Sequence, residues 1–257
     1  MNICSNPLFR VAGGLLLGLL GMQQVQAAVA LDRTRAVFNG GEKSISLSIS
    51  NDNKTLPYLA QGWVEDAQGN KITSPLTVLP PLQRLEPGAK SQIKIQALPG
   101  ANLLVQDRET LFYFNLREIP PKSEKPNTLQ LALQTRIKLF YRPKALGATI
   151  GMVPWQEQLT LSKLGDKYQV NNPTPYYVTI VDASSKSGPA GAEGFEPVMV
   201  APHGKEVLNL GASVLGPNPV LTYVNDYGGR PQLQFTCSGT ECKAEPAKKP
   251  EPVKKES

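Results

Sequence analysis

The side chains that most often carry catalysis are sparse in this sequence. The single histidine, His203, stands in the turn-forming run Pro202-His203-Gly204, with no nucleophile or orienting acid beside it. A general base must reach the proton that it removes, so this histidine is better interpreted as a solvated turn residue. No zinc-protease, phosphate-loop or nucleophile-elbow motif occurs along the chain. We therefore expect no catalytic residue, no metal site and no cofactor, and a protein that is not an enzyme.

Two of the three cysteines are close enough in sequence to form a disulfide. Cys4 precedes an apolar run typical of an export signal, so Cys237 and Cys242 would remain in the exported chain. An even number of cysteines in an oxidising compartment favours a disulfide, and the four residues between them can turn a hairpin. The alternatives are two free thiols or half of a metal site. A metal site needs more ligands than this chain offers, so we expect a Cys237–Cys242 disulfide.

The N-terminus has the composition of a secretory signal peptide at residues 1–27. Arg10 precedes an apolar run at 11–21, and the small residues Val25 and Ala27 predict cleavage between Ala27 and Ala28. As a helix the apolar run reaches only about 16 Å, about half of a bilayer core. We therefore expect an exported protein that is not inserted in a membrane.

The chain has a net charge of +6, and part of this positive charge is concentrated near the C-terminal end of the sequence. Residues 243–257 contain five lysines and three glutamates interleaved with prolines, which is typical of a solvated, disordered tail. No aromatic residue is interleaved there for base stacking, so we expect no nucleic-acid partner.

Short runs of alternating apolar and polar residues predict an all-β fold. Residues 44–50 read Ser-Ile-Ser-Leu-Ser-Ile-Ser, which puts Ile45, Leu47 and Ile49 on one face of a strand. Similar runs, separated by turn residues, continue to residue 141 and resume at residue 159. This spacing is typical of immunoglobulin-type β-sandwiches. The alternating pattern is interrupted at 142–153, a segment that contains Pro and Gly. This interruption predicts a first domain at 28–146 and a second at 147–242.

Residues 128–141, TLQLALQTRIKLFY, form an unusually long alternating run. Its apolar face is made by Leu129, Leu131, Leu133, Ile137, Leu139 and Tyr141. A strand of this length spans roughly 48 Å, whereas a domain of this size has a radius of gyration of about 13 Å. Two interpretations stay open from the pattern alone. The row belongs to the core of its own domain, or part of it forms an edge that another strand can join.

Several motifs resemble the periplasmic pilus-assembly chaperones. The most specific is QDRETLFYFNLREIPP at 106–121, and further matches lie at 31–35, 82–88, 172–177 and 225–231. The resemblance spans residues 28–243 and leaves out the tail. It implies two immunoglobulin-like β-sandwich domains in a boomerang arrangement. It also implies a periplasmic chaperone that binds, folds and caps pilin subunits by lending them a strand, then delivers them to an outer-membrane usher.

The resemblance also implies roles for particular residues. It implies that Leu129, Leu131 and Leu133 enter the subunit groove, while Ile137 and Leu139 pack in the chaperone's own sandwich. Arg35 and Lys138 match a pair of cleft cations that hold the subunit's C-terminal carboxylate. The family's interdomain charge cluster maps onto Glu109, Arg142 and Asp226, and a surface facing the usher maps onto Pro57, Leu59 and Gln61.

Other function classes stay as alternatives. The same scaffold permits an exported binding protein for a small molecule or glycan. A second alternative is a nucleic-acid or membrane-surface protein that uses the basic tail. Self-association of free molecules through the open strand is a further alternative.

Overall fold

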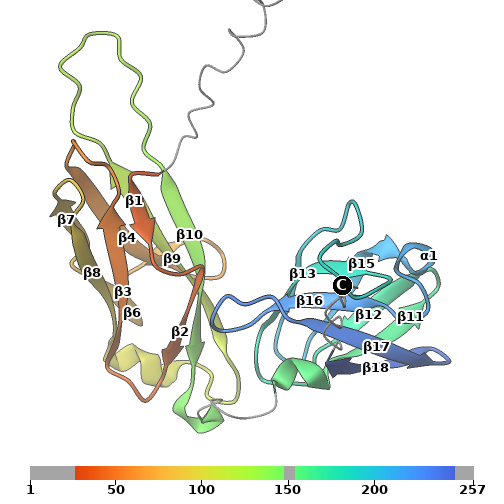
Figure 1. Ribbon diagram of the computed structural model, residues 1–257. Coiled ribbons are helices and arrows are strands. Elements are labelled where there is room, and N and C mark those ends of the chain that lie inside the picture. Colours follow the sequence, from red (N-terminus) through yellow and green to blue (C-terminus); the bar gives the residue numbers. More distant parts are fainter. Residues whose placement is uncertain (1–26, 148–153, 247–257) are drawn as a thin grey trace, which may run out of the picture.

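The computed structural model describes residues 27–147 and 154–246, which form two β-domains side by side (Figure 1). The predicted signal peptide, apart from Ala27, and residues 247–257 of the predicted tail lie outside the described residues. So do residues 148–153, within the expected domain boundary. No helix of the described residues is long and apolar enough to cross a membrane. The prediction of an all-β protein with two immunoglobulin-like domains is confirmed.

The first domain is a sandwich of two sheets. One sheet has the order β1-β3-β8-β6, formed by β1 (Val29–Leu31), β3 (Ser44–Asn51), β6 (Leu76–Leu79) and β8 (Lys90–Ala97). The other has the order β2-β10-β9-β4-β5, with β7 paired to β4. Its strands are β2 (Arg35–Asn39), β4 (Tyr58–Glu65), β5 (Lys71–Ile72), β7 (Leu82–Leu85), β9 (Thr110–Ile119) and β10 (Gln134–Arg142). Alternate residues of these strands fill one core, which includes Ile137 and Leu139 of β10.

The second domain follows one hydrogen-bonded path in the order β14-β13-β16-β17-β18-β11-β12-β15 around its own core. Its strands are β11 (Thr160–Leu164), β12 (Lys167–Asn171), β13 (Val178–Ser184), β14 (Val198–Val200), β15 (Lys205–Gly211), β16 (Val220–Val224), β17 (Gln232–Ser238) and β18 (Glu241–Pro246). Short helices lie in the connections of both domains: η2 (Pro99–Leu103), η3 (Lys144–Leu146), η4 (Trp155–Gln158) and α1 (Ala212–Leu215).

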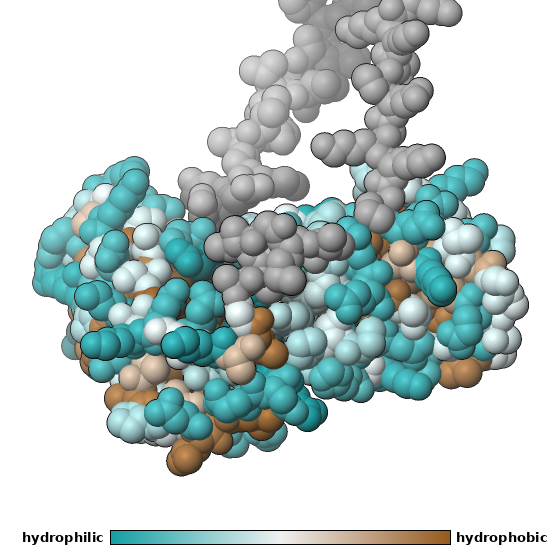
Figure 2. Space-filling model, turned by 90° about the horizontal axis from the view of Figure 1, so that it is seen from below, coloured by the Kyte–Doolittle hydropathy of each residue, from teal (hydrophilic) through white to brown (hydrophobic). Residues whose placement is uncertain are grey.

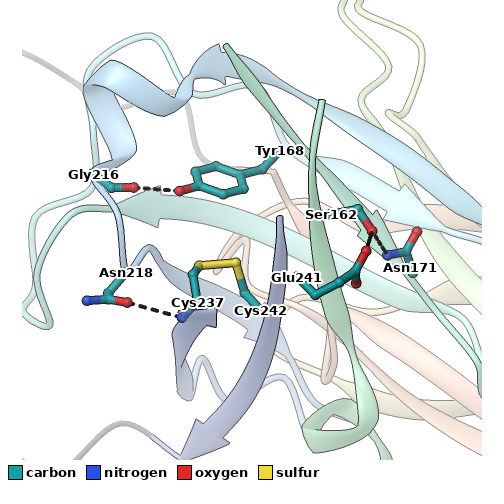
Figure 3. The surroundings of a disulfide bond; sticks show 8 residues. All are labelled: Ser162, Tyr168, Asn171, Gly216, Asn218, Cys237, Glu241 and Cys242. Carbon is teal, nitrogen blue, oxygen red and sulfur yellow. Dashed lines mark hydrogen bonds between the residues drawn. A yellow bond between two sulfur atoms is a disulfide. The ribbon is translucent and has the colours of Figure 1, made fainter. Parts of the chain in front are cut away.

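The predicted Cys237–Cys242 disulfide is confirmed (Figure 3). The two cysteines lie directly opposite each other in the β17–β18 hairpin, and the amide of Cys237 donates a hydrogen bond to the Asn218 side chain. The predicted start of the tail at Lys243 is wrong. Lys243 pairs with residues of both β11 and β17, so strand pairing extends β18 through Pro246.

The face seen from below is mostly hydrophilic, and hydrophobic residues form only small areas on it (Figure 2). The long loop between β9 and β10 lies at the opposite end of the first domain (Figure 1). That loop holds the exposed leucines described next.

Candidate functional site

The expected fourteen-residue strand at 128–141 is wrong in its first part, because β10 begins only at Gln134. The register of β9 and β10, with Arg117 opposite Gln134, would place Pro120 and Pro121 opposite residues 131 and 130. Proline has no backbone N–H to give to a strand ladder, so the pairing stops there. The last ladder-like contact is the Glu118 amide, which donates to the Leu133 carbonyl at 3.0 Å.

The leucines of this segment differ from the core row that follows them. Leu129 is 83% exposed and Leu131 59% exposed, and Leu133 is half-buried. Leu129 and Leu131 line an open groove of about 660 Å³ together with Pro57 and residues of the loop itself. The β9–β10 loop therefore presents alternating leucines to solvent, next to the start of β4.

The residues expected to face the usher lie at this same end of the first domain. Leu59 and Gln61 point outward from β4, and Pro57 directly precedes the strand; all three are half-buried. Pro57 and Leu59 also line a smaller hollow with Pro120.

Arg35 and Lys138 meet across the parallel pair β2–β10, where they occupy directly opposite positions. Both side chains reach the second domain. The Lys138 Nζ donates to the Thr179 hydroxyl at 3.1 Å, and an Arg35 Nη donates to the Val224 carbonyl at 3.0 Å. Thr179 and Val224 are themselves paired across β13 and β16. The two cations therefore converge between the domains.

The charge of this pair is poorly compensated. Burial lowers the pKa of Lys138 to about 8, and the neighbouring Arg35 charge acts in the same direction. Burial also lowers the pKa of Arg35, although Asp226 and Glu109 oppose this. Arg35 Nε is buried with no hydrogen-bond partner among the described residues, and Arg35 lines an open cleft of about 500 Å³ with Tyr227. Such a site favours an anion.

Glu109, Arg142 and Asp226 form one hydrogen-bonded cluster between the domains. Arg142 contacts Glu109 Oε1 at 2.8 Å and Asp226 Oδ2 at 2.9 Å. The other oxygen of Glu109 accepts the amide of Tyr177 at 2.8 Å. The Arg142 guanidinium lies 5.0 Å from the ring centroids of Trp155 and Tyr176. An ion pair and a hydrogen bond from a backbone amide thus connect residues of the first domain to the second.

The ionisation of this cluster follows from its burial. Burial raises the pKa of Glu109 to about 7, although Arg142 and the Tyr177 amide act in the opposite direction. Burial also acts to lower the pKa of Arg142, but Glu109 and Asp226 outweigh it and raise that pKa. The guanidinium therefore stays charged, while the Glu109 carboxyl titrates near neutral pH.

Sequence reasoning missed the second-domain partners of these residues. Thr179 and Val224 gave no signal, because one contributes a hydroxyl from an ordinary strand and the other only its carbonyl. Tyr177, whose ring stacks on Phe140 with centroids 5.5 Å apart, lies inside the family match at 172–177 and could have been singled out. Residues 27–147 and 154–246 contain no group of His, Cys, Asp or Glu that could hold a metal ion.

The fold and the site define a binding protein of two immunoglobulin-like domains, with a leucine-bearing edge segment and a cationic cleft between the domains. Two family models match this chain. The pili and flagellar-assembly chaperone, PapD N-terminal domain, matches residues 28–147, and the pili assembly chaperone PapD, C-terminal domain, matches residues 154–235. The chain therefore belongs to the PapD family and is a chaperone of pilus assembly.

Individual relatives agree with this family. The probable fimbrial chaperone YfcS of Escherichia coli K12 is 51% identical over 243 residues, which cover 95% of this chain and 96% of the relative. The chaperone protein PapD of Escherichia coli is 52% identical over 237 residues, which cover 92% and 93%. Among solved structures, the Salmonella enterica SafA pilin in complex with the SafB chaperone matches with 29% identity and a TM-score of 0.69. That match covers 82% of this chain and 97% of the other.

Proposed function

We propose that this chain binds pilin subunits in the periplasm by donating residues 128–133 as a strand, and delivers them to an outer-membrane usher. The observation that carries the proposal is the exposure of Leu129 and Leu131 on a segment that continues β10 without strand partners among the described residues. Strand addition draws affinity from backbone hydrogen bonds and specificity from alternate side chains. The match to a chaperone solved in complex with a pilin agrees with this mode.

The remaining site residues complete the proposal. Arg35 and Lys138 hold the C-terminal carboxylate of the client, which fills the uncompensated positive site between the domains. The cluster of Glu109, Arg142 and Asp226 fixes the angle at which the domains meet. Pro57, Leu59 and Gln61 contribute to the usher contact, because they lie beside the segment that carries the client.

Export precedes these steps. Cleavage before Ala28 removes the signal segment and leaves a mature chain that starts one residue before β1. Intact-mass measurement of the protein from a periplasmic extract checks this start.

The test of strand donation compares two substitutions on adjacent residues. Leu131→Glu places a charge where an apolar groove must receive it, which costs several kcal/mol of binding. Ala132→Glu, at a position that is also exposed in the free chain, puts the charge on the opposite face of the donated strand. We expect Leu131→Glu alone to abolish co-purification of a pilin subunit, with both variants folded. Equal loss in both variants, or unfolding of Leu131→Glu, contradicts the proposal.

A further inference from the structure

Glu118 continues the inward-facing row of β9. Phe112, Phe114 and Leu116 occupy the preceding alternate positions and belong to the core of the first domain. Glu118 is only 6% exposed. A carboxylate buried in this way is costly unless hydrogen bonds and an opposite charge compensate it.

The carboxylate reaches across the sandwich to the beginning of the other sheet. Its Oε2 accepts the backbone N–H of Val29, the first residue of β1, at 2.8 Å. No lysine or arginine of residues 27–147 and 154–246 lies within the 4.0 Å ion-pair distance of it. Within that part of the chain, the buried charge therefore has a backbone donor and no cation.

The position of Ala28 suggests where the cation comes from. Ala28 is 8% exposed, and its carbonyl accepts the amide of Asp52 at 2.6 Å, so the backbone is held in place there. Consecutive backbone nitrogens lie roughly 3–3.7 Å apart with standard bond lengths. A nitrogen one residue before that of Val29 therefore lies no more than roughly 6.5 Å from Glu118 Oε2. An opposite charge within about 4–6 Å stabilises a buried carboxylate, so an ammonium group at this nitrogen lies inside that range or at its edge.

We infer that Glu118 binds the α-ammonium group that cleavage before Ala28 creates at the amino terminus of the mature chain. The inference rests on the proposed export and cleavage. In the uncleaved chain this nitrogen is a neutral amide, so only the processed chain supplies the charge.

This ion pair lies at the base of the client-binding segment. The backbone N–H of Glu118 donates to the Leu133 carbonyl at 3.0 Å, while its side chain holds the start of β1. One residue thus connects the processed terminus with the end of the β9–β10 loop, which carries the leucines and lies at the top of the first domain in Figure 1. Processing therefore completes the first domain at the place from which the donated strand emerges.

The test is a double-mutant cycle on protein isolated from the periplasm. One change inserts Gly-Ser between Ala27 and Ala28, which moves the ammonium two residues away, and the other is Glu118→Gln. Intact mass first establishes the starting residue of each protein. In urea unfolding, we expect each single change to raise the unfolding equilibrium constant about tenfold or more, and the double change to add little to either. Glu124→Gln, at an exposed loop position, serves as the matched control.

A second readout addresses the amine directly. Acylation of the α-amine over a pH series, followed by mass spectrometry of the N-terminal peptide, gives its titration midpoint. We expect a higher midpoint in the wild type than in Glu118→Gln or in the extended chain. If Glu118→Gln does not fold, wild type and extended chain decide the matter. A start other than Ala28 overturns the processing step. A start at Ala28 with additive effects and equal midpoints overturns the ion pair alone.

Discussion

Binding of a client carboxylate should weaken steeply as the pH rises from 7 to 9. Burial, together with the Arg35 charge, lowers the pKa of Lys138 to about 8 in the empty protein. A C-terminal carboxylate, with an ordinary pKa of about 3.3–3.7, stays ionised over this whole range. The perturbation therefore acts on Lys138, whose charged form is the one that can hold the carboxylate.

The size of the effect follows from the charged fraction. A lysine with a pKa of about 8 is roughly nine-tenths charged at pH 7 and roughly one-tenth charged at pH 9. The apparent dissociation constant scales inversely with the competent fraction, so it should rise about tenfold between these pH values. The same pKa predicts the opposite trend for folding. The unfolded lysine, with its ordinary pKa of 10.5, keeps its proton where the folded one has lost it, so the empty protein gains stability between about pH 8 and 10.5.

The assay is fluorescence anisotropy with a labelled peptide that ends like a pilin subunit, as free acid and as amide. We expect the tenfold weakening for the acid and little change for the amide. Lys138→Met should weaken the acid at pH 7 and remove most of its pH dependence, whereas Lys144→Met, an exposed cation of the same domain, should change neither. Equal pH profiles for acid and amide would refute the reasoning, because Lys138 would then not contact the carboxylate.

Three further predictions concern the interdomain cluster and the disulfide. Arg142→Ala removes the cation that Glu109 and Asp226 share and leaves their hydrogen bonds unmade, so we expect a loss of about 3 kcal/mol or more, or a wider interdomain angle by small-angle scattering; wild-type melts and scattering would contradict this. Because burial raises the pKa of Glu109 to about 7, the unfolded chain releases that proton first, and stability should fall as the pH rises from 4.5 to 7. Glu109→Gln should flatten this slope in urea titrations at several pH values. An unchanged slope would show that another group causes the pH dependence of stability. Replacing Cys237 and Cys242 by serine should cost about 2 kcal/mol, since the closed loop is small, and intact mass with and without reductant should differ by two hydrogens only in the wild type.

The sequence predicts much of this fold because alternation is a local property. Ile45, Leu47 and Ile49 fall in β3 as expected, and the disulfide was predicted from the expected export and the number of cysteines. The first strand was less accessible to such reasoning. The run from Leu31 to Arg35 crosses between the two sheets, with β1 ending at Leu31 and β2 beginning at Arg35. Periodicity carries no information about a change of sheet.

The limits of pattern reasoning are clearest at Glu118 and at residues 128–133. Glu118 occupies a core-facing position that alternation assigns to an apolar residue, and only the opposite sheet shows what it contacts. The row from Leu129 to Leu133 has the same alternation as Ile137 and Leu139, yet only the latter pair is in the core. The difference comes from Pro120 and Pro121, which stand on the other side of the β9–β10 loop and end the ladder.

In the proposed complex, the two ends of the site together determine which client residues face the leucines. On one side of β10 the prolines stop β9 from pairing beyond its end, and on the other side β2 pairs only with Lys138 to Arg142. On the side of β2, the backbone that precedes Lys138 is therefore free to pair with an incoming strand. Lys138 and Leu131 are seven residues apart, or about 24 Å along an extended strand. A carboxylate held at Lys138 would thus place the residue about seven positions from the client's terminus opposite Leu131. A slip of one residue would turn every client side chain to the other face, so the carboxylate contact selects the register as well as contributing affinity.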